Sequence, residues 1–283
     1  MGKGIDNRRY REMEVAEGVF IPDYDVEYPE DNSSDRIVKV RYDGRDVNVF
    51  DENYPYLDDS LSFKIQNFIN QFLLRIIVVP LNNLRYGVKV KGKENLKPFR
   101  KLFKNGAMTV CNHVYRWDLV CVLRAMGIHR TWFPIYAEHL KGKDAWFVRY
   151  CGGIPVPETS GGMRPFNAAF DELHKRKQWM HVFPEASSWR FYTPVRSFKK
   201  GAFTMAYRYG MPLIPCVISY RKRTGIYKIF DKTGEPLITL NVGTPIIPDT
   251  TKPRKDETDR LLHEAHAQMV KMAGITKNPW PAE

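Results

Sequence analysis

From Tyr86 onward, apolar runs of strand length alternate with amphipathic runs of helix length, and this alternation limits the possible folds more than any other feature. The predicted strands are residues 86–91, 107–112, 132–136, 153–156, 179–183 and 213–220. The predicted helices are residues 116–127, 144–151, 166–177 and 199–209. Strands that alternate with helices form a mostly parallel sheet with helices on both faces. The sequence therefore predicts a mixed, mostly parallel α/β sheet flanked by helices.

Further elements are predicted outside this alternation. Strands at 226–231 and 237–242 flank Gly234 and are expected to pair antiparallel, and a last helix is expected at 254–273. A short hairpin is expected around Asp43-Gly44, between residues 37–42 and 46–50. Because no linker-like stretch divides residues 86–283, they are expected to form one domain.

Residues 61–85 have a different character from the regions on either side. Their apolar side chains fall mostly at helical spacing, with Asn and Gln between them. Lys64, Arg75 and Pro80 interrupt the run, so its uncharged stretches are shorter than the ~20 residues of a spanning helix. Two alternatives remain open: an amphipathic helix in a membrane interface, or an ordinary helix packed on the body.

Charge is distributed unevenly along the 283 residues. The net charge is +12, but residues 1–60 hold 8 Lys or Arg against 16 Asp or Glu, which leaves +20 on the remainder. An acidic arm therefore precedes a basic body, and a basic body attracts nucleic acid or an anionic membrane surface. The Lys and Arg are spread along the chain and no nucleic-acid motif occurs, so nucleic acid is not expected as a partner.

The start of the chain and the cysteines bear on the compartment. Residues 1–18 are charged throughout, so no signal peptide is expected. The four cysteines lie far apart, without a close pair, which indicates reduced thiols and no metal site. These features predict a protein at the cytoplasmic face of a membrane, peripheral or monotopic.

The clearest candidate for chemistry is the segment 112–118, which follows the strand 107–112 directly. In a regular helix, His113 and Asp118 point about 140° apart. They can meet only if His113 lies in the strand-to-helix loop and Asp118 in the first helical turn. Asp118 could then fix the tautomer of His113, so that the other ring nitrogen takes a proton from an alcohol.

Two further segments carry candidate binding residues. Glu185, Ser187 and Ser188 follow the strand 179–183, and the ends of strands in α/β sheets are where sites assemble. Lys199 and Lys200 begin a predicted helix and could frame an anion site, or they could lie on a solvated helix face.

The order of these segments resembles that of the 1-acylglycerol-3-phosphate acyltransferases, the glycerolipid acyltransferase family. The resemblance covers roughly residues 86–245. The family's first block, N-H-x-x-x-x-D, matches residues 112–118, and its third, F-P-E-G-[TS]-R-S, is similar to residues 183–189. An F-K-K-G segment stands at 198–201, the fourth block at 212–216, and the family's lead-in to the first block at 87–96.

The resemblance implies a reaction without a metal or other cofactor. His113 would deprotonate the hydroxyl of a membrane lipid acceptor, Asp118 would orient His113, and Glu185 would help to place the acceptor. The acyl donor would be acyl-CoA or acyl-carrier protein.

The departures from the family's blocks concern the acceptor. Glu158 stands where a phosphate-binding Arg is expected, Ser188 replaces another expected Arg, and Ala186 replaces Gly. Arg164 and Arg190 lie nearby and could substitute. Three alternatives follow: a lysophospholipid acceptor, a phosphate-free or amine-bearing lipid acceptor, or a relative that binds lipid without catalysis.

Overall fold

The structure is a computed structural model that describes residues 12–23, 26, 28–29, 49–127, 129–142, 144–230 and 234–283. The hairpin expected around Asp43-Gly44 lies outside these residues.

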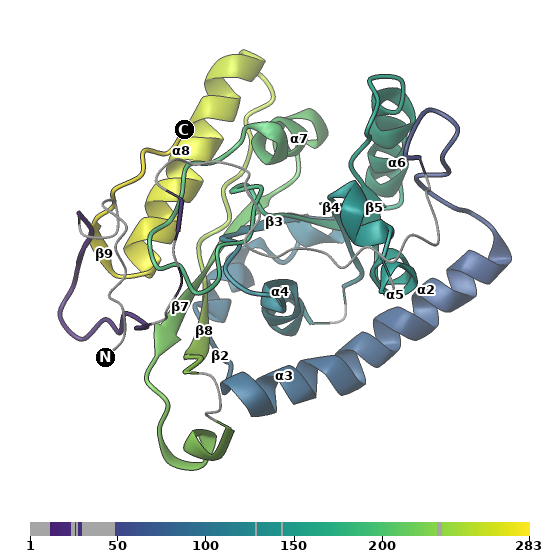
Figure 1. Ribbon diagram of the computed structural model, residues 1–283. Helices are drawn as coiled ribbons and strands as arrows, with labels where there is room; N and C mark the ends of the chain where they lie inside the picture. Colours follow the sequence, from purple (N-terminus) through teal and green to yellow (C-terminus); the bar gives the residue numbers. More distant parts are fainter. Residues whose placement is uncertain are drawn as a thin grey trace.

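A seven-stranded mixed sheet forms the centre of the described protein (Figure 1). Its order is β2-β8-β7-β3-β6-β4-β5, and only β7 and β8 pair antiparallel, so that most of the sheet is parallel as predicted. The strands are β2 (Lys89–Lys91), β3 (Met108–Cys111), β4 (Thr131–Ile135), β5 (Gly153–Pro155), β6 (Trp179–Val182), β7 (Leu213–Arg221) and β8 (Leu237–Val242). A separate pair joins β1 (Glu14–Val15) to β9 (Ile275–Lys277).

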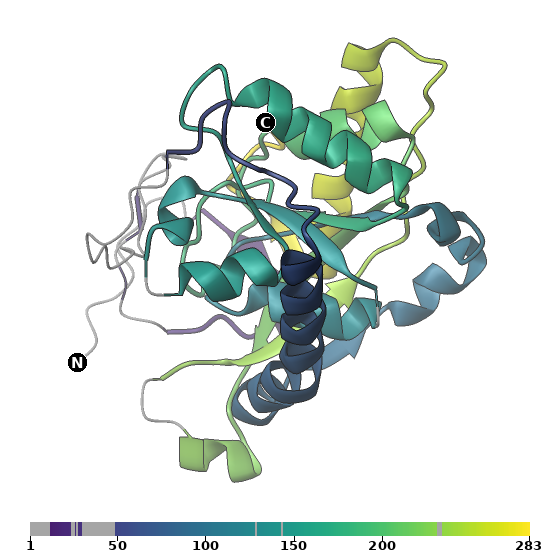
Figure 2. The same ribbon diagram turned by 90° about the vertical axis from the view of Figure 1, so that its right-hand side faces the viewer.

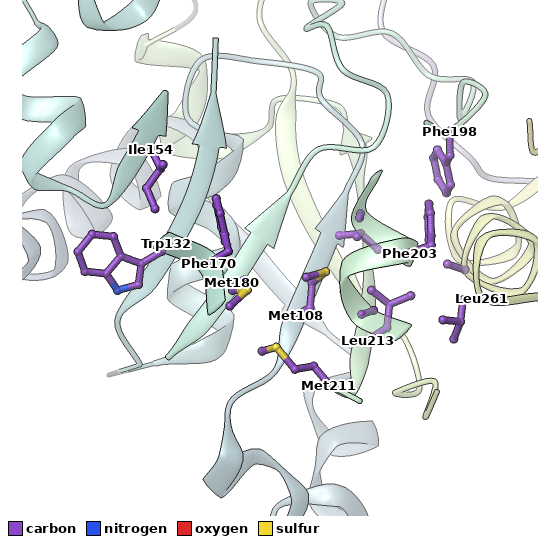
Figure 3. Packing of buried hydrophobic residues seen from close by; sticks show 14 of the residues in the cluster. Met108, Trp132, Ile154, Phe170, Met180, Phe198, Phe203, Met211, Leu213 and Leu261 are labelled. Atoms are coloured by element: carbon purple, nitrogen blue, oxygen red, sulfur yellow. The ribbon is translucent and has the colours of Figure 1, made fainter. Parts of the chain in front are cut away.

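Helices cover both faces of the sheet, and the side chains of β3 show why. Met108 and Val110 enter the larger apolar cluster, whereas Ala107 and Cys111 enter a second one. This alternation places α6, α7 and α8 on one face and α4 on the other (Figures 1 and 3). The helices are α4 (Asp118–Met126), α5 (Ala145–Tyr150), α6 (Met163–Lys175), α7 (Gly201–Tyr209) and α8 (Arg254–Met272). Short 3-10 turns are η2 (Lys93–Phe99), η3 (Leu102–Asn105), η4 (Ala137–Leu140) and η5 (Gly225–Phe230).

A long helix precedes the sheet and lies along one side of the body (Figures 1 and 2). It consists of α2 (Leu61–Leu73), a π-helical turn η1 (Leu74–Val78) and α3 (Val79–Tyr86). The widened turn has a local cause: Pro80 has no N–H to donate, and its ring crowds the preceding turn. No helix in the described part of the chain is both long and apolar enough to cross a bilayer.

A largely polar face of α2 lies against the body, together with the buried side chains of Phe63 and Leu74. Asn67 donates to the carbonyl of Tyr150 and Gln71 to that of Cys151. Six apolar side chains of α2 and η1 are instead about half exposed: Ile65, Phe68, Ile69, Phe72, Ile76 and Ile77. The long helix therefore presents a continuous apolar face to its surroundings.

Two predicted strands differ from the structure. Residues 226–231 were expected to form a strand, but η5 spans Gly225–Phe230, and β8 pairs with β7 instead. The expectation was wrong because Ile226 and Ile229 are spaced by three, which suits a 3-10 turn, and both point outward. The strand expected at 86–91 is reduced to Lys89–Lys91, because Tyr86 ends α3 and Gly87 caps it in the left-handed conformation.

Candidate active site

The loop between β3 and α4 holds His113 at the carboxyl edge of the sheet. Asn112 anchors the loop, because its side chain bonds both the N–H (2.8 Å) and the carbonyl (3.2 Å) of Ile218 in β7. On its other side the loop pairs with an irregular segment: the N–H of Trp189 donates to the carbonyl of His113, and the N–H of Phe191 donates to the carbonyl of Val114. The backbone around His113 is thus fixed from two directions.

His113 and Asp118 meet across this loop. His113 Nδ1 lies 2.5 Å from Asp118 Oδ2, and Asp118 is the first residue of α4. The Asp118 carboxylate also accepts the N–H groups of Val114 (3.1 Å) and Leu119 (2.8 Å). The Asp118 side chain is 2% exposed and that of His113 26%. A carboxylate held in this way accepts from Nδ1–H, which leaves Nε2 of His113 as the nitrogen able to accept a proton.

Glu185 is buried beneath the same loop and holds its backbone in place by hydrogen bonds. Its Oε2 accepts the N–H of His113 at 2.9 Å, and its Oε1 accepts the N–H of Arg196 at 2.9 Å. The Arg196 guanidinium lies 3.3 Å from Glu185 Oε2 and donates to the hydroxyl of Ser187 at 2.9 Å. The side chains of Glu185 and Arg196 are 1% and 0% exposed, so this ion pair is buried in the protein interior.

Arg196 is a residue that the sequence reasoning missed. It lies in the irregular segment between β6 and α7, eleven positions after Glu185, where no periodicity indicates its direction. Burial lowers the pKa of its guanidinium, and the carboxylate of Glu185 opposes that shift. The Arg196 guanidinium also lies over the ring of Trp189, 4.2 Å from its centroid.

Aromatic and imidazole rings line the side of His113. Its ring stacks on Phe183 with centroids 4.1 Å apart, and Phe183 meets His181 edge to face at 4.3 Å. His181 is fully buried and lies 2.8 Å from the hydroxyl of Thr109 on the neighbouring strand. Burial, and secondarily the nearby His113, lowers the pKa of His181 to about 3. His181 is therefore neutral at physiological pH and adds no charge beside His113.

The remaining predicted binding residues are distributed around this centre. Ser187 bonds Arg196, and the hydroxyl of Ser188 is buried without a hydrogen-bond partner among the described residues. Arg190 pairs with the buried Glu235, which Arg85 also contacts at 3.0 Å.

Glu158 and Arg164 follow β5. Glu158 lies 2.5 Å from Lys141 and also accepts the N–H of Phe50 at 3.5 Å. Arg164 is exposed at the start of α6. Because β5 and β3 run in the same direction, Glu158 and His113 lie at the same edge of the sheet.

The two candidate lysines lie at the start of α7. Lys200 pairs with Asp259 of α8 and with Glu283, each at 2.9 Å. Both lysines line a hollow of about 480 Å³ with Trp280 and Pro281 of the C-terminal segment. Among the described residues, no group of His, Cys, Asp and Glu could hold a metal ion.

Comparison with known proteins agrees with the arrangement of these segments. Residues 87–219, which contain β3, the His113 loop and most of β7, match the acyltransferase family. This match covers a little under half of the chain. Among solved structures, the chain is similar to the 1-acyl-sn-glycerophosphate (LPA) acyltransferase PlsC from Thermotoga maritima, with 18% identity and a TM-score of 0.47. That similarity covers 74% of this chain and 97% of PlsC, and no curated protein matches the sequence.

One departure from the family's third block has a backbone consequence. Ala186 replaces the expected Gly and has a φ of +64°, in the left-handed region that disfavours a Cβ. We expect Ala186→Gly to raise the free energy of unfolding by about 1 kcal/mol, since the strain of the Cβ exceeds the added entropy of the unfolded chain. Urea unfolding measures this. In the matched control Ala206→Gly, within α7, we expect a loss of about 1 kcal/mol or more. A loss of stability in Ala186→Gly would contradict the strain argument.

Proposed function

We propose that the protein transfers a fatty acyl group from acyl-CoA or acyl-carrier protein to a hydroxyl of a lysophospholipid or related lipid. The observation that carries this proposal is the contact between His113 and Asp118 within an acyltransferase-family domain. His113 Nε2 accepts the proton of the lipid hydroxyl as its oxygen attacks the thioester carbonyl. The C–O bond forms, the C–S bond breaks, and the proton passes from His113 to the departing thiolate.

The long helix supports a location at a membrane surface. Most of its apolar side chains are exposed, while Asn67 and Gln71 pack on the body, which is unlike a helix that only stabilises a soluble core. Residues 61–283 carry a net charge of +20, which favours an anionic leaflet. We therefore propose that the protein docks at the cytoplasmic face of a membrane as a peripheral or monotopic protein.

A second candidate concerns the acceptor's head group. Glu158 stands where one arginine is expected, and its carboxylate is paired with the ammonium of Lys141. This position therefore holds a negative and a positive charge side by side. The Arg196 guanidinium, which bonds Ser187 of the altered third block, is buried and paired with Glu185. This arrangement favours an acceptor that is phosphate-free or amine-bearing, with the Glu158–Lys141 pair bonding sugar hydroxyls or a zwitterion.

The test is acyl transfer from labelled long-chain acyl-CoA and acyl-carrier protein to a panel of lysolipids presented in vesicles. We expect one acceptor class to be labelled, and we expect His113→Ala to abolish the transfer. If lysophosphatidic acid is labelled best and Glu158→Arg changes nothing, the second candidate is wrong. If no acceptor is labelled with either donor while the protein still binds vesicles, it is a lipid-binding relative without catalysis.

A further inference from the structure

A second exposed apolar element lies between β7 and β8, separate from the long helix in sequence. We call residues 222–230, which contain η5, the η5 loop. Ile226 is 64% exposed and Ile229 is 76% exposed, which is unusual for isoleucines outside a binding surface when they lie together. Lys222 and Lys228 are exposed beside them. Apolar tips with flanking cations are typical of segments that enter the interface of an anionic bilayer.

The η5 loop is fastened to the end of the long helix. Arg223 is 6% exposed and donates to the carbonyls of Arg85 and Tyr227, both at 3.1 Å. It therefore ties the loop to the last turn of α3. The ring of Tyr227 covers Gly87, where an added Cβ would lie only 2.9 Å from that ring. A side chain at Gly87 would push the loop away, so this glycine permits the close packing.

The loop continues the exposed apolar face of the long helix. Leu81 and Leu84 of α3 are 60% and 51% exposed, and α3 is in contact with η5. Figures 1 and 2 show the loop, in green at the bottom of both views, projecting beyond the sheet beside α3. The contacts of Arg223 and Tyr227 hold the two apolar elements in a fixed relation.

We propose that the η5 loop is a second membrane contact, which inserts Ile226 and Ile229 into the same anionic bilayer that α2 and α3 contact. This proposal rests on the membrane docking proposed above. We assign an anionic bilayer as the partner of the η5 loop for two reasons. The loop is continuous with the exposed apolar face of α3, and its exposed lysines are opposite in charge to anionic lipid head groups. Two contacts at separate points would also fix the tilt of the body, and with it the position of the His113 loop above the lipid.

Site-specific labelling tests insertion directly. The four native cysteines are all buried, so a cysteine introduced at an exposed position can be labelled selectively with an environment-sensitive dye. We expect dyes at Ile229→Cys and Phe72→Cys to brighten on vesicles of phosphatidylcholine with phosphatidylglycerol, and to be quenched by spin-labelled lipid. A dye at Ile247→Cys, a 40% exposed isoleucine after β8, is the matched control and should not respond.

Partitioning separates this proposal from the one on which it rests. We expect the double variant Ile226→Ser/Ile229→Ser to lower vesicle affinity roughly tenfold, and Leu102→Ser/Ile247→Ser to leave it unchanged. If the dye at Phe72→Cys responds but the dye at Ile229→Cys does not, the long helix docks and the loop proposal is wrong. If neither responds, the proposed membrane docking itself fails. Equal losses in both double variants would also overturn the loop proposal, since the effect would not be specific to the loop.

Discussion

Replacing His113 with Ala is expected to lower kcat/KM for acyl transfer by about 10³-fold, within the range for removing a general base. No neighbouring side chain described beside His113 can take over as the base. Phe183 carries no proton acceptor, and His181 is buried with its Nδ1 bonded to the hydroxyl of Thr109. His113→Gln keeps a polar side chain against Phe183 and should be equally inactive. Transfer assays at saturating and at low acceptor concentration would measure the loss, with thermal unfolding to show that each variant is folded.

Asp118→Asn tests the orienting role separately from the base. The amide oxygen can still accept from Leu119, but the amide NH₂ would face the N–H of Val114 and Nδ1–H of His113, so donors would oppose donors. His113 would then favour the tautomer with its proton on Nε2, which cannot take a proton from the acceptor hydroxyl. We expect a loss of about 10²-fold or more. His263→Ala, an exposed histidine on α8, is the matched control. If His113→Ala keeps activity within a few-fold of the unchanged protein, the catalytic proposal is wrong.

The alternation of strands and helices could be predicted because each element has its own period. In β3, the side chains of Met108 and Val110 face one apolar cluster, and Ala107 and Cys111 face the other. The approach of His113 to Asp118 also followed from local geometry, since five positions can be bridged only across a loop that enters a helix. Features that depend on a period of 2 or 3.6 residues are encoded within a short window of sequence.

What the sequence could not show depends on contacts between distant segments. Helical spacing predicted an amphipathic helix at 61–85, but only the bonds of Asn67 and Gln71 to the end of α5 show that these polar side chains lie on its inner side. Likewise, residues 226–231 were expected to form a strand, although Ile226 and Ile229 lie in a 3-10 turn. Their outward direction is set by Arg223, which bonds the end of α3 more than 130 positions earlier in the chain.

The pairing of Glu185 with Arg196 is another feature that the sequence could not show. Its disruption is expected to have the largest effect on stability. Both side chains are almost fully buried, so each charge depends on the other. We expect Arg196→Met to lower the free energy of unfolding by about 3–5 kcal/mol, because it leaves the Glu185 carboxylate buried without a cation. Arg196→Lys keeps the charge but lacks the planar fork that reaches Glu185 and Ser187 together, so its loss should be intermediate. Urea unfolding measures all three proteins.

The double variant Glu185→Gln/Arg196→Met separates the cost of an unpaired charge from the cost of lost packing. Without the carboxylate no charge is left uncompensated, and the Gln amide oxygen can still accept the N–H of His113. We therefore expect the double variant to be more stable than Arg196→Met alone. Arg176→Met, which breaks a surface pair with Asp59, should cost under about 1 kcal/mol. The account fails if Arg196→Met costs no more than this surface control, or if the double variant is no more stable than the single one. Because Glu185 holds the backbone of His113, acyl transfer by folded Arg196→Met should also fall, in kcat more than in KM.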